Sequence, residues 1–478
     1  MTKKTDQPKM KHELSLLDGT MLVAGSMIGS GIFIVSADII RNVGSAGWLI
    51  AIWLLTGFMT LTAALSYGEL SGMFPKAGGQ YVYLKEAYNK FIAFLYGWSF
   101  FAVIQTGTIA AVGVAFSKFA AYIYHPFSEE NILCDLGFVK ISAAQVVSII
   151  LIIFLTFINS RGVKGGKLIQ NTFTLTKLLS LFGLIGFGFL ALRGDIWQAN
   201  WSNAWDIHNL SKTGNITALT IGGALGAIAA AMVGSIFSSD AWNSVTFIAG
   251  EMKNPKRDVA LSLGLGTLIV TIIYVSANFV YTGVLSLHDI ASADKDRVAV
   301  AASHVIFGNI GTYIIAVMIM ISTFGCNNGL ILSGARVYYS MAKDGLFFKR
   351  TGDLNKFGVP QFGLWLQCLV ASILCLSGRY GDLLDMISFV VVIFYVLTIF
   401  GIFILRAKHP NADRPYKAFG YPILPAIYIL MGLAFCTLLI IYKPQFTWPG
   451  LIIVLIGIPI YFISQRNVKH NDETVTDS

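Results

Sequence analysis

The chain has 478 residues, of which 55% are hydrophobic and only 12% are charged. Soluble globular proteins carry about 25% charged residues, so this composition excludes a soluble domain that is merely tethered to a membrane. The formal net charge is +9. Because the basic residues lie where membrane topology requires them, as described below, we expect no nucleic-acid partner.

Twelve apolar segments follow one another along the chain. About 20 apolar residues cross the hydrocarbon core as a helix, and these segments are too long for barrel strands. The predicted fold is therefore an all-α polytopic membrane protein with twelve transmembrane helices. The expected spans are roughly 17–40, 47–71, 92–124, 142–159, 168–192, 217–250, 260–286, 311–341, 362–378, 383–405, 423–442 and 448–464. The first span exceeds a signal-peptide core, so we expect it to be retained.

The first span is weakened at its centre. It contains MLVAGSMIGSGIFIVSADII at 21–40, in which Gly25, Ser26, Gly29, Ser30 and Gly31 crowd the middle. Glycine costs about 1 kcal/mol relative to alanine in a helix interior, so we expect this span to be broken. The alternative is close helix packing through Gly25-x-x-x-Gly29.

A second interruption falls in span six. Residues 221–247 read IGGALGAIAAAMVGSIFSSDAWNSVTF, an apolar half followed by Ser238, Ser239 and Asp240 and then a Trp-containing half. Breaks in spans one and six predict an inverted repeat of five plus five helices, followed by two C-terminal helices. The expected organisation is an N-terminal tail at 1–14, a first repeat at 15–193, an outer loop at 194–216, a second repeat at 217–406, helices eleven and twelve at 407–465 and a C-terminal tail at 466–478.

The two breaks together predict a substrate site. Backbone N–H groups at a helix start suit a carboxylate, and freed carbonyls nearby suit an ammonium, so the pair fits the backbone of an α-amino acid. The expected carboxylate-binding residues are Gly29, Ser30 and Gly31. The expected ammonium-binding carbonyls are those of Ser26, Met27 and Ile28, with those around Phe237 and Ser238.

Ionisable and aromatic side chains add further candidates. Lys177 lies deep in span five, where an ammonium should meet carbonyls or hydroxyls, either functionally or as a structural bond between helices. Asp240 could tune the side-chain pocket, carry a proton or cap the half-helix. Trp242 and Asn243 could line the side-chain end of the site, and Phe237 could cover the ligand. For both aromatic residues the alternative is packing.

The distribution of Lys and Arg residues among the loops predicts the orientation of the chain in the membrane. With the N-terminus inside, 24 of the 34 Lys and Arg residues lie on the inner side, 8 lie in outer loops, and Lys118 and Lys177 lie within or near spans. This bias predicts a multi-pass protein of the plasma (inner) membrane with both termini in the cytoplasm. Of the five cysteines, only Cys134 falls in an outer loop. A free thiol is the expectation there, and a link to a partner chain the less favoured alternative.

Several segments resemble the amino acid–polyamine–organocation permeases, most closely the L-type amino acid transporters and bacterial serine/threonine and alanine exchangers. They are VAGSMIGSGIFI, LSYGELSGMFPKAGGQYVYLKEAY, FSSDAWNSVTFIAGEMKNPKRD and SGARVYYSMAKDGLFF, and the likeness runs from about 14 to 465. The resemblance implies the LeuT-like five-plus-five fold of that superfamily.

The resemblance also implies residue roles. The family's carboxylate-binding turn matches Gly29, Ser30 and Gly31, its amine-binding carbonyls match Ser26, Met27 and Phe237, its gate matches Phe237, and its side-chain contact matches Asn243. Lys177 matches a lysine that substitutes for a sodium ion and bridges the first break and span eight. Leu330 stands where relatives often have a small hydroxyl residue, which leaves Ser322, Thr323 and Asn328 as candidate partners. Animal relatives pair with a heavy chain through an outer-loop cysteine, and Cys134 falls in the equivalent loop.

The sequence therefore predicts a sodium-independent neutral amino acid transporter, an exchanger or a proton-coupled permease, that works by alternating access. The alternative is a polyamine or cationic amino acid permease, because the carboxylate of Asp240 could attract a cationic substrate. We expect no catalytic residues, metal or cofactor, because no nucleophile–base or ligand constellation lies in the spans. A channel would require repeated polar rings along a pore.

Overall fold

The computed structural model describes residues 12–135, 140–377 and 380–476. The first half of the chain contains α1 (Leu16–Met27), α2 (Gly31–Val43), α3 (Ala46–Met73), α4 (Gln80–Ala87), α5 (Lys90–Ser99), the π-helical η1 (Phe100–Ile104), α6 (Gln105–Ile123), η2 (His125–Phe127), β1 (Ile132–Asp135), β2 (Lys140–Ser142), α7 (Ala143–Ser160), α8 (Val163–Leu190) and α9 (Gly194–Ser202).

The second half is built in the same way from long helices with short connections. It contains β3 (His208–Leu210), β4 (Ile216–Ala218), α10 (Ile221–Ser238), α11 (Ser244–Phe247), η3 (Ala249–Glu251), α12 (Pro255–Val284), α13 (Leu287–Ala291), η4 (Asp294–Asp296), α14 (Val298–Lys343), η5 (Lys349–Gly352), α15 (Gln361–Ser377), α16 (Tyr380–Lys408), α17 (Ile423–Tyr442) and α18 (Pro444–Thr476).

The helical prediction is confirmed, with two small β-hairpins added. Nine helices of the described chain are long and apolar enough to cross a membrane, and α1 and α2, bent by 41° at their junction, form one more. Shorter apolar stretches at Gln361–Leu376 and Thr447–Ile463 coincide with predicted spans nine and twelve. The count of twelve and the division into repeats stay predictions. Helix α18 continues to Thr476, through most of the segment expected as a tail.

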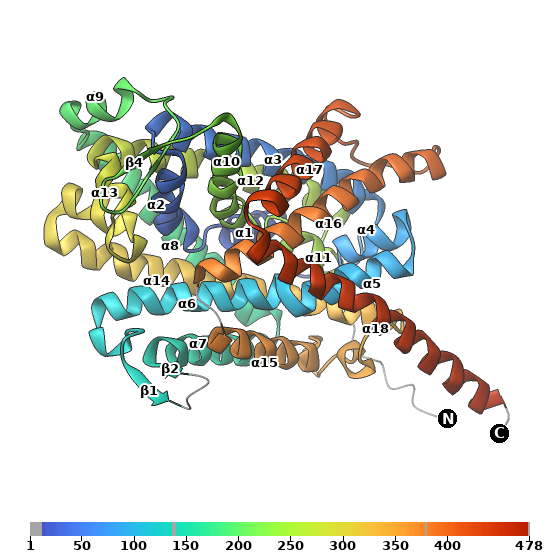
Figure 1. Cartoon of the computed structure of the whole chain (residues 1–478). Coiled ribbons are helices and arrows are strands. Elements are labelled where there is room, and N and C mark those ends of the chain that lie inside the picture. Colours follow the sequence, from blue (N-terminus) through green and yellow to red (C-terminus); the bar gives the residue numbers. More distant parts are fainter. Residues whose placement is uncertain (1–11, 136–139, 378–379, 477–478) are drawn as a thin grey trace.

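The helices form two layers around α14. In Figure 1, α6, α7 and α15 run side by side below α14, and α1, α3, α10 and α12 lie above it. The main contacts of the upper layer join α3 to α12, α1 to α12 and α2 to α10. The hairpins β1–β2 and β3–β4 lie at the left end of the view together with α9 and α13, and α18 projects at the right.

Both predicted breaks occur. Helix α1 starts at a capping box between Ser15 and Asp18 and ends at Met27, and three residues separate it from the start of α2 at Gly31. Helix α10 ends at Ser238, one residue later than the sequence suggested. The second half of span six is shorter than expected, because α11 has only four residues before the turn η3.

Candidate functional site

Lys177 joins the first break to a neighbouring helix. Its side chain is 1% exposed, and its Nζ donates to the Gly25 carbonyl, to the Ile28 carbonyl at 2.7 Å and to the Ser322 carbonyl of α14 at 3.5 Å. The hydroxyl of Ser322 also donates to Ile28 and Gly29, at 3.1 and 3.2 Å. Of the three candidate partners in α14, Ser322 is therefore the one in contact. The ammonium satisfies carbonyls that the break has released from helical bonding.

The other two carbonyls expected to bind an ammonium also accept protein donors. The Ser26 carbonyl accepts the Cys326 thiol at 2.9 Å. The hydroxyl of Tyr274 lies 2.9 Å from both the Met27 carbonyl and the Ser238 carbonyl, so one side chain bridges the two breaks. Each carbonyl has two lone pairs. Both are engaged at Met27, because its carbonyl also accepts the Gly29 N–H at 2.8 Å. A substrate ammonium would therefore have to displace a donor at Met27, whereas it could use the second lone pair at Ser26.

The glycines of the first break are required for close packing. A Cβ added to Gly31 would lie 1.9 Å from Ser238 Oγ, so the start of α2 touches the end of α10. A Cβ on Gly25 would meet Gln170 and Thr174 of α8 at 2.1 and 2.2 Å. The packing explanation for this motif therefore has direct support, and it holds alongside the unwinding. The close packing and the unwinding both follow from the absence of a side chain at glycine.

The second break carries a carboxylate and a strained residue. The Tyr395 hydroxyl of α16 donates to Asp240 Oδ1 at 2.5 Å. The next residue, Ala241, has φ +62°, a conformation that non-glycine residues adopt only where surrounding structure imposes it. Asp240 does not cap the half-helix, because α11 begins at Ser244 and its N-cap is Asn243. The capping hypothesis for Asp240 is therefore wrong.

A polar cavity adjoins this second break. Its walls come from helices α5, α6, α14 and α16 and from Gln80 at the start of α4. The π-helical η1 contributes two of the lining residues. Its lining consists of Gln80, Tyr96, Phe100, Ile104, Gln105, Thr108, Asp240, Ala241, Asn243, Ser244, Leu330, Val391 and Tyr395. Of the predicted site residues, Asp240 and Asn243 line it. Those of the first break are buried beside it without contributing to its wall.

Sequence reasoning missed several of the lining residues. Asn243 donates to Gln80 Oε1 at 3.1 Å, and Gln80 donates to Thr398 at 3.0 Å. The side-chain amide of Gln105 donates to the Leu330 carbonyl at 2.6 Å. An isolated glutamine in the middle of an apolar span was the available signal for Gln105. Tyr395 gave no such signal, because tyrosine is common in apolar helices.

The two aromatic candidates lie outside the lining. Trp242 packs edge-on against Tyr67 and obliquely against Tyr395, with ring centroids 4.7 and 5.1 Å apart. Phe237 is 7% exposed, and its carbonyl accepts the Asp240 backbone N–H at 3.2 Å. In this conformation Trp242 packs against Tyr395, which lines the cavity, and does not line it itself. This is the packing role that was the alternative for Trp242.

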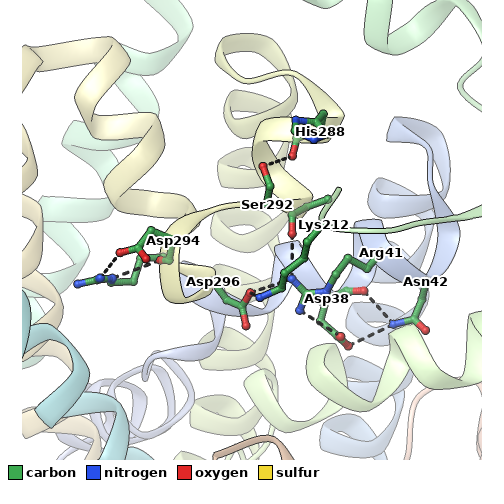
Figure 2. A network of polar contacts seen from close by, with 10 residues as sticks. Asp38, Arg41, Asn42, Lys212, His288, Ser292, Asp294 and Asp296 are labelled. Carbon is green, nitrogen blue, oxygen red and sulfur yellow. Dashed lines mark hydrogen bonds and ion pairs between the residues drawn. The ribbon is translucent and has the colours of Figure 1, made fainter. Parts of the chain in front are cut away.

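A polar network closes one end of α2. Figure 2 shows the Asp296 carboxylate of η4 between Arg41 of α2 and Lys212, at 2.8 and 3.1 Å. Arg41 also donates to the Ala291 carbonyl of α13 at 3.0 Å. Burial raises the pKa of Asp296, but the positive charges of Arg41 and Lys212 outweigh it and hold that pKa below the ordinary 3.8. The second half of the broken span, α2, is therefore tied to the segment that precedes α14.

Comparison with known proteins decides the family. The family model described as "Amino acid permease" matches residues 14–463, nearly the whole chain. The chain belongs to the amino acid permease family. This permease is thus a multi-pass integral membrane transporter and not an enzyme, in agreement with the prediction from sequence.

Individual relatives match over similar lengths. The Bacillus subtilis "Serine/threonine exchanger SteT" is 30% identical over 96% of this permease and 98% of the relative. The human "Large neutral amino acids transporter small subunit 2" is 27% identical over 95% of this permease and 80% of the relative. The human "Asc-type amino acid transporter 1" is 27% identical over 96% and 83% respectively.

Proposed function

We propose that this permease is a sodium-independent transporter of neutral amino acids that works by alternating access in the plasma (inner) membrane. It would have twelve spans in a five-plus-five inverted repeat, with both termini in the cytoplasm. The observation that carries the proposal is the contact between the two breaks, where Tyr274 reaches Met27 and Ser238 and Lys177 holds the released carbonyls. Paired discontinuous helices are where such transporters bind substrate.

The substrate would lie between the breaks. Its carboxylate would accept from the N–H groups of Gly29, Ser30 and Gly31, at and just before the start of α2 and at the positive end of the helix dipole. The Gly29 N–H donates to the Met27 carbonyl at 2.8 Å and would have to leave that bond. Its ammonium would meet the carbonyls of the first break and of Phe237 and Ser238. Its side chain would extend toward the polar cavity.

A neutral side chain suits that cavity better than a cationic one. Its other polar groups are amides and hydroxyls, and the Asp240 carboxylate already accepts from Tyr395. The printed names of the relatives include a serine/threonine exchanger and a large neutral amino acid transporter. These observations support neutral substrates over the polyamine or cationic alternative.

Sodium independence rests on Lys177. Its ammonium supplies a permanent positive charge to the Gly25, Ile28 and Ser322 carbonyls, the ligand type that a sodium ion would otherwise need. Exchange and proton coupling both remain compatible with this arrangement. We also propose that the permease works without a heavy chain, although the name of one human relative, "small subunit", describes a member of an assembly.

Uptake by proteoliposomes tests the proposal. Vesicles loaded with unlabelled serine are assayed for labelled serine uptake against a panel of competitors. We expect inhibition by neutral amino acids, and none by putrescine or by analogues that have only the amine or only the carboxylate. Uptake that needs internal amino acid identifies an exchanger, whereas uptake into empty vesicles driven by a pH gradient identifies proton coupling. Competition by lysine and putrescine, with none by neutral amino acids, would refute the proposal.

A further inference from the structure

We propose that this permease binds an anionic phospholipid in a groove between α3, α12 and the loop that connects α16 to α17. The groove encloses about 1170 Å³ of space, part of it open to the surroundings, and has an apolar wall and a basic end. Residues of the candidate substrate site take no part in it. The inference is therefore independent of the proposed function.

Leucine side chains form the apolar wall. Leu61 and Leu65 come from α3, and Leu261, Leu265 and Leu268 come from α12. The last three are 39–45% exposed, on a helix long and apolar enough to span a membrane. Gly264 lies between them, and a Cβ there would meet only Leu65, at 3.6 Å. The surface is thus hollowed where lipid tails surround the protein.

Two cations mark one end of the groove. Lys256 and Arg257 lie in the first turn of α12, and both are exposed. Lys256 lies 3.6 Å from the exposed carboxylate of Asp413, a contact worth little at a surface. Among the described residues Arg257 makes no ion pair. Asp258, the acidic residue of the same turn, is buried at 5% exposure. Cations at a helix N-terminus are disfavoured by the helix dipole, so an anion beside the two exposed cations would relieve an unfavourable arrangement.

The third wall is held in place by buried ion pairs. Pro415 and Tyr416 line the groove, and the loop that carries them is anchored on Glu69 of α3. Arg414 donates to Glu69 at 3.2 Å, and the backbone N–H of Ala418 donates to it at 2.7 Å. The Glu69 side chain is 1% exposed. The groove is therefore a formed site between fixed elements.

The combination of an apolar channel and a basic end fits one occupant. An acyl chain would lie along the leucines, and the lipid phosphate would reach the two cations, whose long side chains extend to the interface. A zwitterionic headgroup would bring its own ammonium close to Lys256 and Arg257. A net anionic headgroup such as phosphatidylglycerol is therefore preferred.

The test measures lipid retained by the full chain. Protein is purified from membranes in mild detergent, exchanged with a mixture of phosphatidylglycerol and phosphatidylcholine, and analysed by native mass spectrometry. Each basic residue near a lipid surface contributes about 1 kcal/mol, so Lys256→Gln with Arg257→Gln should lower the preference for phosphatidylglycerol roughly tenfold or more. Gly264→Leu, which fills the groove without removing charge, should reduce retention of both lipids.

Matched controls make the test decisive. Lys349→Gln with Lys356→Gln removes two exposed cations between α14 and α15, far along the chain from the groove, and should leave the retained lipid unchanged. The proposal is overturned if the Lys256 and Arg257 variant keeps the wild-type preference. It is also overturned if the wild-type protein retains the two lipids equally.

Discussion

Gly31 shows how a single missing side chain serves two purposes. The carboxylate-binding hypothesis and the packing hypothesis both require glycine there, because the Cβ position falls against Ser238. A single substitution that abolishes transport would therefore not distinguish them. A paired substitution does.

We predict that Gly31→Ala lowers both the amount of folded protein and transport. Adding Ser238→Gly removes the atoms 1.9 and 2.5 Å from the new Cβ and should restore the folded amount. Transport should stay at least roughly tenfold lower, with a raised KM, since the methyl group occupies the space between the breaks. Size-exclusion profiles and uptake kinetics measure the two effects, with Ser238→Gly alone as the control. Full recovery of transport would assign Gly31 to packing only.

Lys177 is the residue on which sodium independence depends. Its removal leaves the buried Gly25 carbonyl without its donor and takes from the Ile28 carbonyl one of two donors, the other being the Ser322 hydroxyl. An unsatisfied buried polar group costs about 1–3 kcal/mol. We predict that Lys177→Met lowers transport more than tenfold, whereas Lys349→Met at an exposed site leaves it unchanged. Replacing external sodium by choline should not alter the wild-type uptake rate. A rate that saturates with sodium would reassign Lys177 to packing.

Asp240 links the break to α16 through Tyr395. We predict that Asp240→Asn changes affinity or substrate preference and leaves the pH dependence of uptake intact, because the residue lines the cavity and an asparagine oxygen can still accept from Tyr395. Tyr395→Phe should shift the same preference. Competition assays at several pH values measure both variants. If Asp240→Asn instead loses pH-dependent net uptake and keeps exchange and preference, Asp240 carries the coupling proton.

At the scale of elements, the decisive feature is how α2, the second half of the broken span, is held. Helix α2 packs along α10, where Val35 touches Gly234, and its far end is tied to η4 and α13 through Arg41 (Figure 2). Any motion that moves α2 away from η4 and α13 must break the contacts of Arg41. The sequence predicted the break in this span but not the network that holds its end.

We predict that Asp296→Asn loosens α2. With a Val35→Cys reporter in a Cys134→Ser background, a membrane-impermeant maleimide should label the reporter up to about fivefold faster, as expected for a partly exposed ion pair. Asp195→Asn, which removes the exposed pair with Arg193, is the control and should change nothing. Equal labelling rates in the Asp296 and Asp195 variants would show that the network does not hold α2.

The pH dependence of this network has a definite sign. The pKa of Asp296 lies below its ordinary 3.8, so the ionised pair contributes stability above that value and loses it only as pH falls further. Labelling of Val35→Cys should therefore be independent of pH between about 5 and 8, once it is corrected for maleimide reactivity. Faster labelling on mild acidification within that range would contradict the assignment.

At the scale of the whole molecule, Cys134 reports topology. It lies in the β1–β2 hairpin and is exposed, whereas the other four cysteines are buried. With both termini in the cytoplasm, an impermeant maleimide should label intact cells at Cys134, and Cys134→Ser should abolish the labelling. Electrophoresis without reductant should show no larger disulfide-linked species. Labelling only after permeabilisation would reverse the orientation.

The sequence by itself determined the class of the molecule and the position of its irregularities. Long apolar runs in a chain of low charge can only be membrane helices, because lipid satisfies no backbone polar groups. Glycine and serine clusters at 25–31 and the Ser-Ser-Asp run at 238–240 marked the breaks, since local helix propensity fails there. The depth of Lys177 predicted that it would meet carbonyls.

Only the tertiary structure decided which groups these irregularities meet. The contact between Gly31 and Ser238, the bridge made by Tyr274, and the choice of Ser322 over Thr323 and Asn328 as the partner of Lys177 each depend on helix rotation and register. The pairing of Asp240 with Tyr395 joins residues 155 positions apart. Apolar periodicity is nearly uninformative in helices that are apolar on most faces, so the face that each helix turns toward its neighbours is fixed by packing between distant segments.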